Sequence, residues 1–169
     1  MNKKENMNKI KIVALNGVVL AATIALQMIN LPNIVTGVIV NSIFIFMTLH
    51  AGVRSSVVLC LLSPFGALIS GHLAGPMYPV LPVIAIGNAL MVILFSKFYN
   101  KSMWKRLLIP AFVKALFIGL IGLLAVNLFL PDKVANFILF GVLGIQFFTA
   151  VPGIWFGIKL NAVISRGKG

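Results

Sequence analysis

The sequence predicts an all-α, polytopic membrane protein with six transmembrane helices, and three observations support this fold class. The chain has 169 residues, of which 60% are hydrophobic and 9% are charged, with a mean hydropathy of +1.09. Soluble domains carry about a quarter charged residues, and a soluble chain of this length could not bury so much apolar surface. The apolar residues also fall into six runs, and the basic residues gather at alternate ends of these runs.

A helix needs about 20 residues to cross a hydrocarbon core of about 30 Å. The first apolar run, Ile12 to Ile29, spans 18 residues, which is longer than the ~7–15 residues of a signal-peptide core, so we expect a retained helix. The runs are separated by the segments NLPN, HAGVR, LAGPMYP, YNKSMWK and PDKVAN. The expected spans are residues 10–30, 34–50, 55–73, 79–98, 106–130 and 136–160. They leave no loop long enough for another domain, so residues 1–169 are expected to form one domain.

The basic residues predict the orientation of the chain. If the N-terminus is cytoplasmic, that side collects twelve of the 14 basic residues: Lys3, Lys4, Lys9, Lys11, Arg54, Lys97, Lys101, Lys105, Arg106, Lys159, Arg166 and Lys168. The other side collects Lys133, and Lys114 falls inside the fifth span. By the positive-inside rule, both termini are expected in the cytoplasm.

Composition also argues against several functions. The net charge of +12 does not indicate nucleic-acid binding, because no polar segment is long enough to form a solvated basic face. The two acidic residues, Glu5 and Asp132, lie outside the expected spans, whereas ion-coupled carriers commonly place a carboxylate within the membrane. Cys60 is alone, and no metal-ligand spacing or H-E-x-x-H motif is present. We therefore expect neither an enzyme nor a bound cofactor.

The first span carries two different faces. On a helix that advances about 100° per residue, one face holds a row of four small residues: Ala14, Gly17, Ala21 and Ala25. The opposite face holds a polar stripe: Asn16, Thr23, Gln27 and Asn30. Polar side chains avoid lipid and are expected to face the bundle, which turns the small face outwards. Small residues let helix backbones approach closely, so this face suits either packing within the bundle or contact with another protein.

Other spans each bring one or two polar side chains into an apolar run. Asn88 lies within PVIAIGNALMVILF, Asn41 lies on the second span, and Gln146 and Thr149 lie on the sixth. Each of them could serve only a hydrogen bond between helices. Together they resemble the few oriented polar groups of a small-molecule pocket in an apolar bundle. The candidate substrate-binding residues are Gln27, Asn41, His72, Tyr78, Asn88, Gln146 and Thr149.

Two further features extend this set. The segment SGHLAGPMYPVLP contains His72 and Tyr78 among three prolines, which suits either a stiff lid over an outer pocket or an interfacial turn with a belt tyrosine. Lys114 lies about 12 Å from the inner end of its span. Its side chain is expected to snorkel to the cytoplasmic interface, with a counter-ion for a ligand carboxylate as the alternative.

A six-span, basic, carboxylate-poor chain with A-x-x-x-A at Ala21 and Ala25 resembles the S components of energy-coupling factor (ECF) vitamin transporters over its whole length. The resemblance implies that Gly17, Ala21 and Ala25 dock on a transmembrane coupling subunit. It further implies a multi-pass protein of the bacterial plasma membrane that captures a vitamin at the outer face. The coupling subunit and two cytosolic ATPases would power its release, and this chain has no G-x-x-x-x-G-K-[ST] of its own.

Within that family, LPNIVTGVIVNSIFIF, PVLPVIAIGNALMVILF and IQFFTAVPG look like the branch proposed to carry cobalamin precursors, dimethylbenzimidazole or its riboside, alpha-ribazole. A neutral or weakly anionic heterocycle fits better than a cation such as thiamine, because no intramembrane carboxylate is available. Two other classes of function stay open. The chain could be a structural or assembly subunit of another membrane complex, or a small enzyme acting on lipid, although the lack of a carboxylate–histidine constellation argues against the enzyme.

Overall fold

The computed structural model describes residues 3–29, 31–69, 78, 80–129 and 132–167, with side chains for all of these except 3–9, 126–127, 129 and 132–143. The described residues form six α-helices and no strand. The helices are α1 (Lys3–Met28), α2 (Asn33–His50), α3 (Val53–Ile69), α4 (Leu81–Phe98), α5 (Met103–Phe129) and α6 (Asp132–Arg166). Each coincides with one expected span, which confirms the all-helical fold class.

Five of these helices are long and apolar enough to cross a membrane, counted over the described residues. Their candidate spans are Ile10–Met28, Asn33–His50, Leu81–Phe98, Met103–Ala125 and Gly144–Arg166. The remaining apolar helix, Val53–Ile69, has 17 residues, which is at the short limit of about 17 for a membrane span. The helices also present large apolar side chains outwards, such as Phe112, Leu120 and Leu128. A surface that contacts lipid has this character.

The helix ends follow from local chemistry. Pro32 precedes α2 with a φ of −52°, and proline occupies the first turn of α4, where its missing N–H removes no helical hydrogen bond. Gly52 has a φ of 93°, a left-handed conformation that glycine adopts without steric cost, and it turns α2 directly into α3. Pro64, Pro110 and Pro152 lie inside helices without ending them, which membrane helices tolerate.

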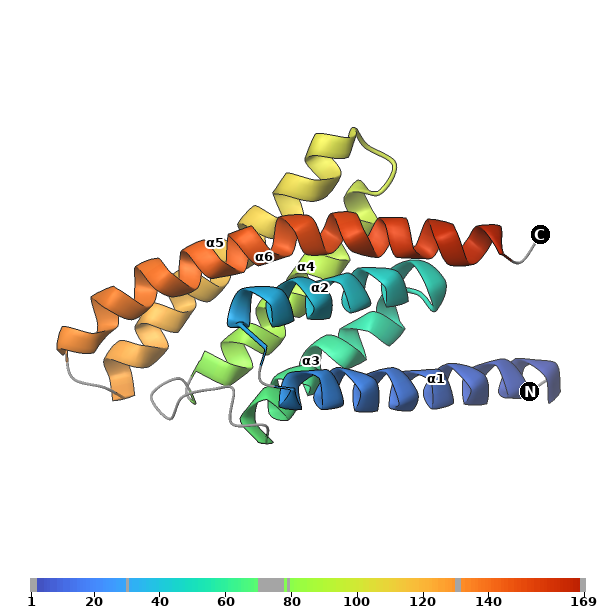
Figure 1. Ribbon diagram of the computed structural model, residues 1–169, viewed down its shortest axis with the longest axis horizontal. Helices are drawn as coiled ribbons and strands as arrows, with labels where there is room; N and C mark the ends of the chain where they lie inside the picture. Colours follow the sequence, from blue (N-terminus) through green and yellow to red (C-terminus); the bar gives the residue numbers. More distant parts are fainter. Residues whose placement is uncertain (1–2, 30, 70–77, 79, 130–131, 168–169) are drawn as a thin grey trace.

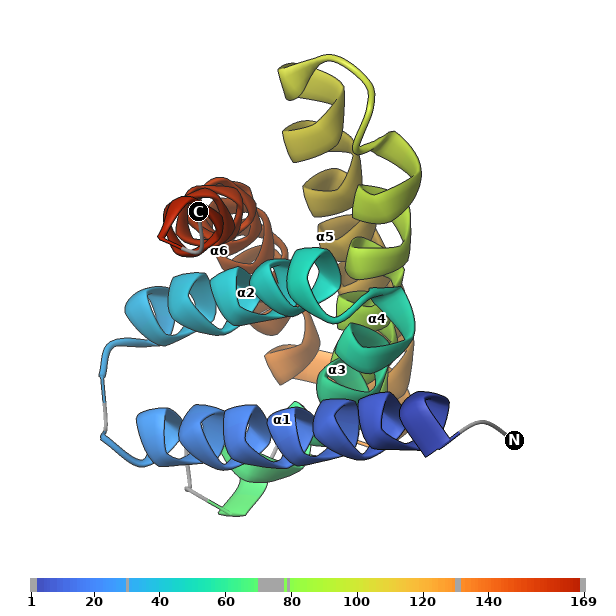
Figure 2. The ribbon, with the colours of Figure 1, turned by 90° about the vertical axis from the view of Figure 1, so that its right-hand side faces the viewer.

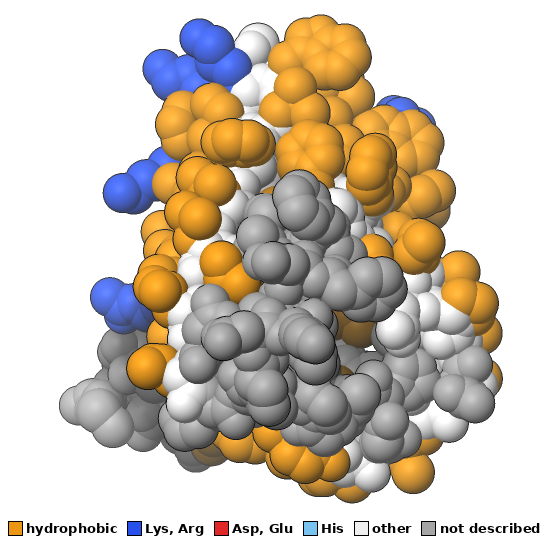
Figure 3. Space-filling model, turned by 90° about the vertical axis from the view of Figure 1, so that its left-hand side faces the viewer, with side chains coloured by type: hydrophobic (Ala, Val, Ile, Leu, Met, Phe, Trp, Pro, Cys, Tyr) orange, Lys and Arg blue, Asp and Glu red, His pale blue; other side chains and the backbone are white. Residues whose placement is uncertain are grey.

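Five helices pack in a series, and α2 contacts four of them. In the series α1 packs on α3, α3 on α4, α4 on α5 and α5 on α6, while α2 contacts α6, α3, α4 and α1 (Figures 1 and 2). The beginning of α1 and the end of α6 lie at the same end of the molecule (Figure 1). Viewed from the opposite end, the described side chains are mainly hydrophobic, and Lys and Arg side chains appear only at the margin (Figure 3).

Close backbone contact joins α2 to α6. A Cβ added at Gly153 would lie 2.5 Å from Asn41 Cβ, and one at Gly157 would lie 2.6 Å from Ser42 O. The G-x-x-x-G spacing therefore places both glycines on the face of α6 that meets α2, where small residues allow close approach. The fully buried side chains of Phe44, Ile45 and Ile154 pack beside this seam. This contact fixes the position of the polar side chains that the two helices carry inwards.

Candidate functional site

The two faces of α1 are oriented as the sequence predicts. Thr23 and Gln27 are buried, whereas Gly17, Ala21 and Ala25 are exposed. Helix α1 packs mainly on α3 and to a smaller extent on α2, so it lies at the side of the bundle. Its polar stripe faces the neighbouring helices and its small face is free. Asn30, the last member of the expected stripe, lies outside the described residues.

Two hydrogen bonds attach this polar stripe to α3. Ser55 Oγ donates to Asn16 Oδ1 at 2.6 Å, and Gln27 Nε2 donates to Ser63 Oγ at 3.2 Å. The side chain of Gln27 is 4% exposed, and its Oε1 atom is buried with no hydrogen-bond partner among the described residues. Gln27 therefore ties two helices together through its nitrogen and leaves a free acceptor inside the bundle.

A second polar cluster lies at the centre of the bundle and joins three helices. Lys114 Nζ of α5 donates to Asn41 Oδ1 of α2 at 2.6 Å. Asn41 Nδ2 makes a long contact of 3.5 Å with Thr149 Oγ1 of α6, and Thr149 Oγ1 also lies 3.3 Å from the backbone oxygen of Gln146. Asn41, Lys114 and Thr149 are all buried. The structure thus brings two of the candidate binding residues, Asn41 and Thr149, into one cluster.

Lys114 does not snorkel, so the expectation that its ammonium reaches the cytoplasmic interface is wrong. Its side chain is 2% exposed, because it belongs to the inward stripe of α5 that contains Ala111, Ala115 and Ile118. The amide oxygen of Asn41 meets the ammonium inside the bundle. Moving an ammonium from water into an apolar interior costs on the order of several kcal/mol of hydration free energy. A hydrogen bond offsets only part of this cost.

Asn88 is buried on the inner face of α4 and is 6% exposed. Its side-chain amide makes no hydrogen bond to any residue that the structure describes. A helix-tying role would place a donor or acceptor of another helix beside it, and none is found there.

The other candidates are more dispersed. Gln146 is half-buried on α6, one turn before Thr149, and its backbone oxygen rather than its side chain takes part in the central cluster. Tyr78 is 52% exposed, unlike the buried amides. His72 lies outside the described residues. In the part of the chain that the structure covers, no group of three metal-ligating side chains is found.

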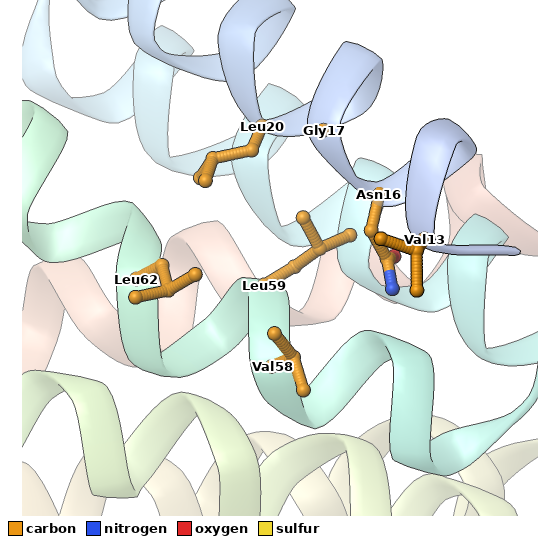
Figure 4. A pocket seen from close by; sticks show the side chains of 7 residues that line it. All are labelled: Val13, Asn16, Gly17, Leu20, Val58, Leu59 and Leu62. Atoms are coloured by element: carbon orange, nitrogen blue, oxygen red, sulfur yellow. The ribbon is translucent and has the colours of Figure 1, made fainter. Parts of the chain in front are cut away.

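Helices α1 and α3 enclose a groove with a volume of about 290 Å³ (Figure 4). Its lining is apolar apart from one amide: Val13, Asn16, Gly17, Leu20, Val58, Leu59 and Leu62. Leu59 projects from α3 into the space below α1 (Figure 4). Gly17 belongs both to this groove and to the exposed small face, so the groove continues that face towards α3.

The chain matches no family model, no curated protein and no solved structure. The functional argument therefore depends on the residues and the geometry described above.

Sequence reasoning missed the central cluster as a unit. It identified Asn41, Thr149 and Lys114 separately, but the lysine and the asparagine are 73 residues apart. The signal that could have found the pair is general: an amide and an unpaired cation at matching depth in an otherwise apolar bundle tend to meet, because each needs a polar partner.

Proposed function

We propose that this protein is the substrate-binding S component of an ECF-type vitamin importer, with six membrane spans and both termini in the cytoplasm of a bacterial cell. It captures a neutral or weakly anionic vitamin or vitamin precursor at the outer face. The resemblance makes cobalamin precursors, such as dimethylbenzimidazole, alpha-ribazole and their derivatives, candidate ligands. A membrane coupling subunit and two cytosolic ATPases drive the uptake, and the chain itself is not an enzyme.

The observation that carries this proposal is the opposite orientation of the two faces of α1. Gly17, Ala21 and Ala25 form an exposed strip of small side chains, while Gln27 on the other face holds a buried, unpartnered acceptor. Small residues permit close helix contact in lipid, and unpartnered buried amides suit ligand recognition. A single helix can thereby connect a partner outside the bundle with a ligand inside it.

The docking half of the proposal is tested by enlarging the small face. We expect Ala21→Trp and Ala25→Trp to abolish co-purification with the coupling subunit and ATPases, and to stop uptake of labelled alpha-ribazole by cells that contain the complete importer. Ligand binding by the purified chain should persist, because neither side chain faces the interior. Leu120→Trp, at an exposed position of α5, is the matched control and should leave the complex intact. Unchanged complex formation in the α1 variants would contradict the proposal.

One set of observations favours a second candidate, a structural or assembly subunit of another membrane complex. Hydrogen bonds between helices occupy Asn16, Gln27 and Asn41, and these bonds would serve rigidity alone. That protein would co-purify with membrane proteins other than the ATPases and would release no small molecule on denaturation. Retention of a heterocycle by the purified chain excludes this candidate.

A further inference from the structure

Among the residues that the structure describes, the interior lysine Lys114 has no anionic partner. Lys114 is 2% exposed, and its ammonium makes one hydrogen bond within the described part of the chain, to Asn41 Oδ1 at 2.6 Å. An ammonium has three donors, so two of them lack an acceptor there. The two carboxylates of the whole sequence belong to Glu5 and Asp132, in the first turns of α1 and α6, whereas Lys114 lies in the middle of α5.

The groups packed around Lys114 supply no negative charge. Asn41 and Thr149 are neutral, and Cys60 is the one titratable group in electrostatic contact with the ammonium among the residues described. Cys60 is completely buried, and a buried cysteine behaves as a small hydrophobic side chain. The described groups around Lys114 are therefore neutral.

The proposed protein partner cannot supply the missing charge at its docking face. That face belongs to α1, which packs on α3 and α2, whereas Lys114 lies on α5 and points to the centre between α2 and α6. Ionisable residues within a membrane pair with one another or with backbone carbonyls, and they mark the paths of substrates. A small molecule that enters the bundle is the partner that can reach this position.

The depth of the cluster fits the proposed ligand site. Asn41 lies eight residues into α2 and Asn88 lies seven residues into α4, which correspond to about 12 and 10 Å along the helices. Both helices begin at the same end of the bundle (Figure 1). Asn41 and Asn88 therefore both lie in the first halves of helices that begin at the same end of the bundle.

We infer that the ligand carries an acidic group, a carboxylate or a phosphate, which binds the ammonium of Lys114. The inference rests on the proposed function and narrows its ligand class to organic acids. The anion accepts the donors that Asn41 leaves unused, and such charge-assisted hydrogen bonds are the stronger kind. The amide of Asn88 stays available for an uncharged part of the same molecule.

The test begins with the ligand that the protein acquires in the cell. Wild type, Lys114→Met and Lys97→Met are purified in detergent from a vitamin-rich medium and denatured, and the released small molecules are identified by mass spectrometry. Lys97 is an exposed residue in the last turn of α4, so its variant controls for loss of a positive charge. Wild type and Lys97→Met should release an acidic compound in near-stoichiometric amount, and Lys114→Met should release little of it.

Ligand binding to the purified wild-type protein tests, without a variant, whether the ligand is acidic. It also distinguishes a carboxylate from a phosphate. The probes are three acids, each with its uncharged counterpart: nicotinate with nicotinamide, pantothenate with pantothenol, and the phosphate ester of alpha-ribazole with alpha-ribazole. We expect one acid to bind at least about thirtyfold more tightly than its counterpart, as is typical when a buried charge partner is lost. Lys114→Met should abolish that preference.

The outcomes separate the inference from the proposed function. If wild type releases or binds an uncharged compound and Lys114→Met does so equally, the inference is refuted while the binding function stands. If no compound is released and no probe binds to the folded protein, both are refuted. If Lys114→Met fails to fold, the preference of wild type between each acid and its uncharged counterpart still decides whether the ligand carries an acidic group.

Discussion

Replacing Gly157 with alanine tests whether α2 and α6 are held at backbone contact. The new Cβ would lie 2.6 Å from Ser42 O and 2.7 Å from Ile45 Cβ. Ser42 O belongs to the backbone of α2 and cannot rotate away, so α6 has to move outwards. Added volume in a well-packed core costs about 1–3 kcal/mol, whereas alanine gains about 1 kcal/mol over glycine in a helix. The free energy of unfolding should therefore fall by about 0–2 kcal/mol.

A matched variant on the same helix removes the uncertainty in helix propensity. A Cβ at Gly144 has nothing within 4 Å, so Gly144→Ala gains only the helical preference and should stabilise by about 0.5–1 kcal/mol. The difference between the two variants should then equal the contact penalty alone, about 1–3 kcal/mol.

The assay is unfolding of the protein in dodecyl maltoside micelles by increasing amounts of sodium dodecyl sulfate, followed by circular dichroism and analysed as a two-state transition. The reasoning predicts that Gly157→Ala is less stable than Gly144→Ala. Equal shifts in the two variants, or a reversed order, would refute the close contact between α2 and α6. Gly153→Ala provides a second test, because its Cβ would lie 2.5 Å from Asn41 Cβ and 3.0 Å from Val38 O.

The remaining predictions concern the buried polar groups. Asn41→Leu leaves the ammonium of Lys114 without its acceptor and should lower the free energy of unfolding by about 3 kcal/mol. Adding Lys114→Met should restore most of this loss. A double-mutant cycle in the same unfolding assay measures the coupling between the two residues. Asn88→Leu removes an amide that has no hydrogen bond within the described structure, so the unfolding free energy should stay constant or rise by about 1 kcal/mol, while the dissociation constant of the copurified ligand, measured by calorimetry, should rise. An unchanged dissociation constant would remove Asn88 from the ligand site. Ser55→Ala breaks the 2.6 Å bond to Asn16 and should destabilise the protein by about 1 kcal/mol, whereas Ser165→Ala, at an exposed position within α6, should not destabilise it.

The sequence predicted the helices well because lipid imposes strong constraints on length and composition. Each expected span corresponds to one helix, and the helical periodicity of α1 correctly separated buried Gln27 from exposed Ala21 and Ala25. Both results depend on local patterns, namely about 20 apolar residues for a span and about 100° per residue for a face.

The sequence could not predict how the polar side chains pair. Whether Lys114 reaches the interface or turns inwards depends on the rotation of α5 in the bundle, which packing against α4 and α6 determines. Its partner Asn41 lies on another helix and is 73 residues away in the sequence. Whether the amide of Asn88 meets a hydrogen-bond partner among the described residues also depends on what other helices place beside it, and no local pattern contains that information.

The arrangement of α1 also determines which part of the protein opens most easily. Two side-chain hydrogen bonds, from Ser55 to Asn16 and from Gln27 to Ser63, hold it to α3, and it has little contact with the helices around the central cluster. Segments with few buried contacts open locally at a lower free energy than the whole fold. Amide hydrogens of α1 should therefore exchange with solvent deuterium before those of α2, and binding of a partner to α1 should slow their exchange while leaving α2 unchanged. The helix that faces outwards would then act as a separately mobile unit of an otherwise rigid bundle.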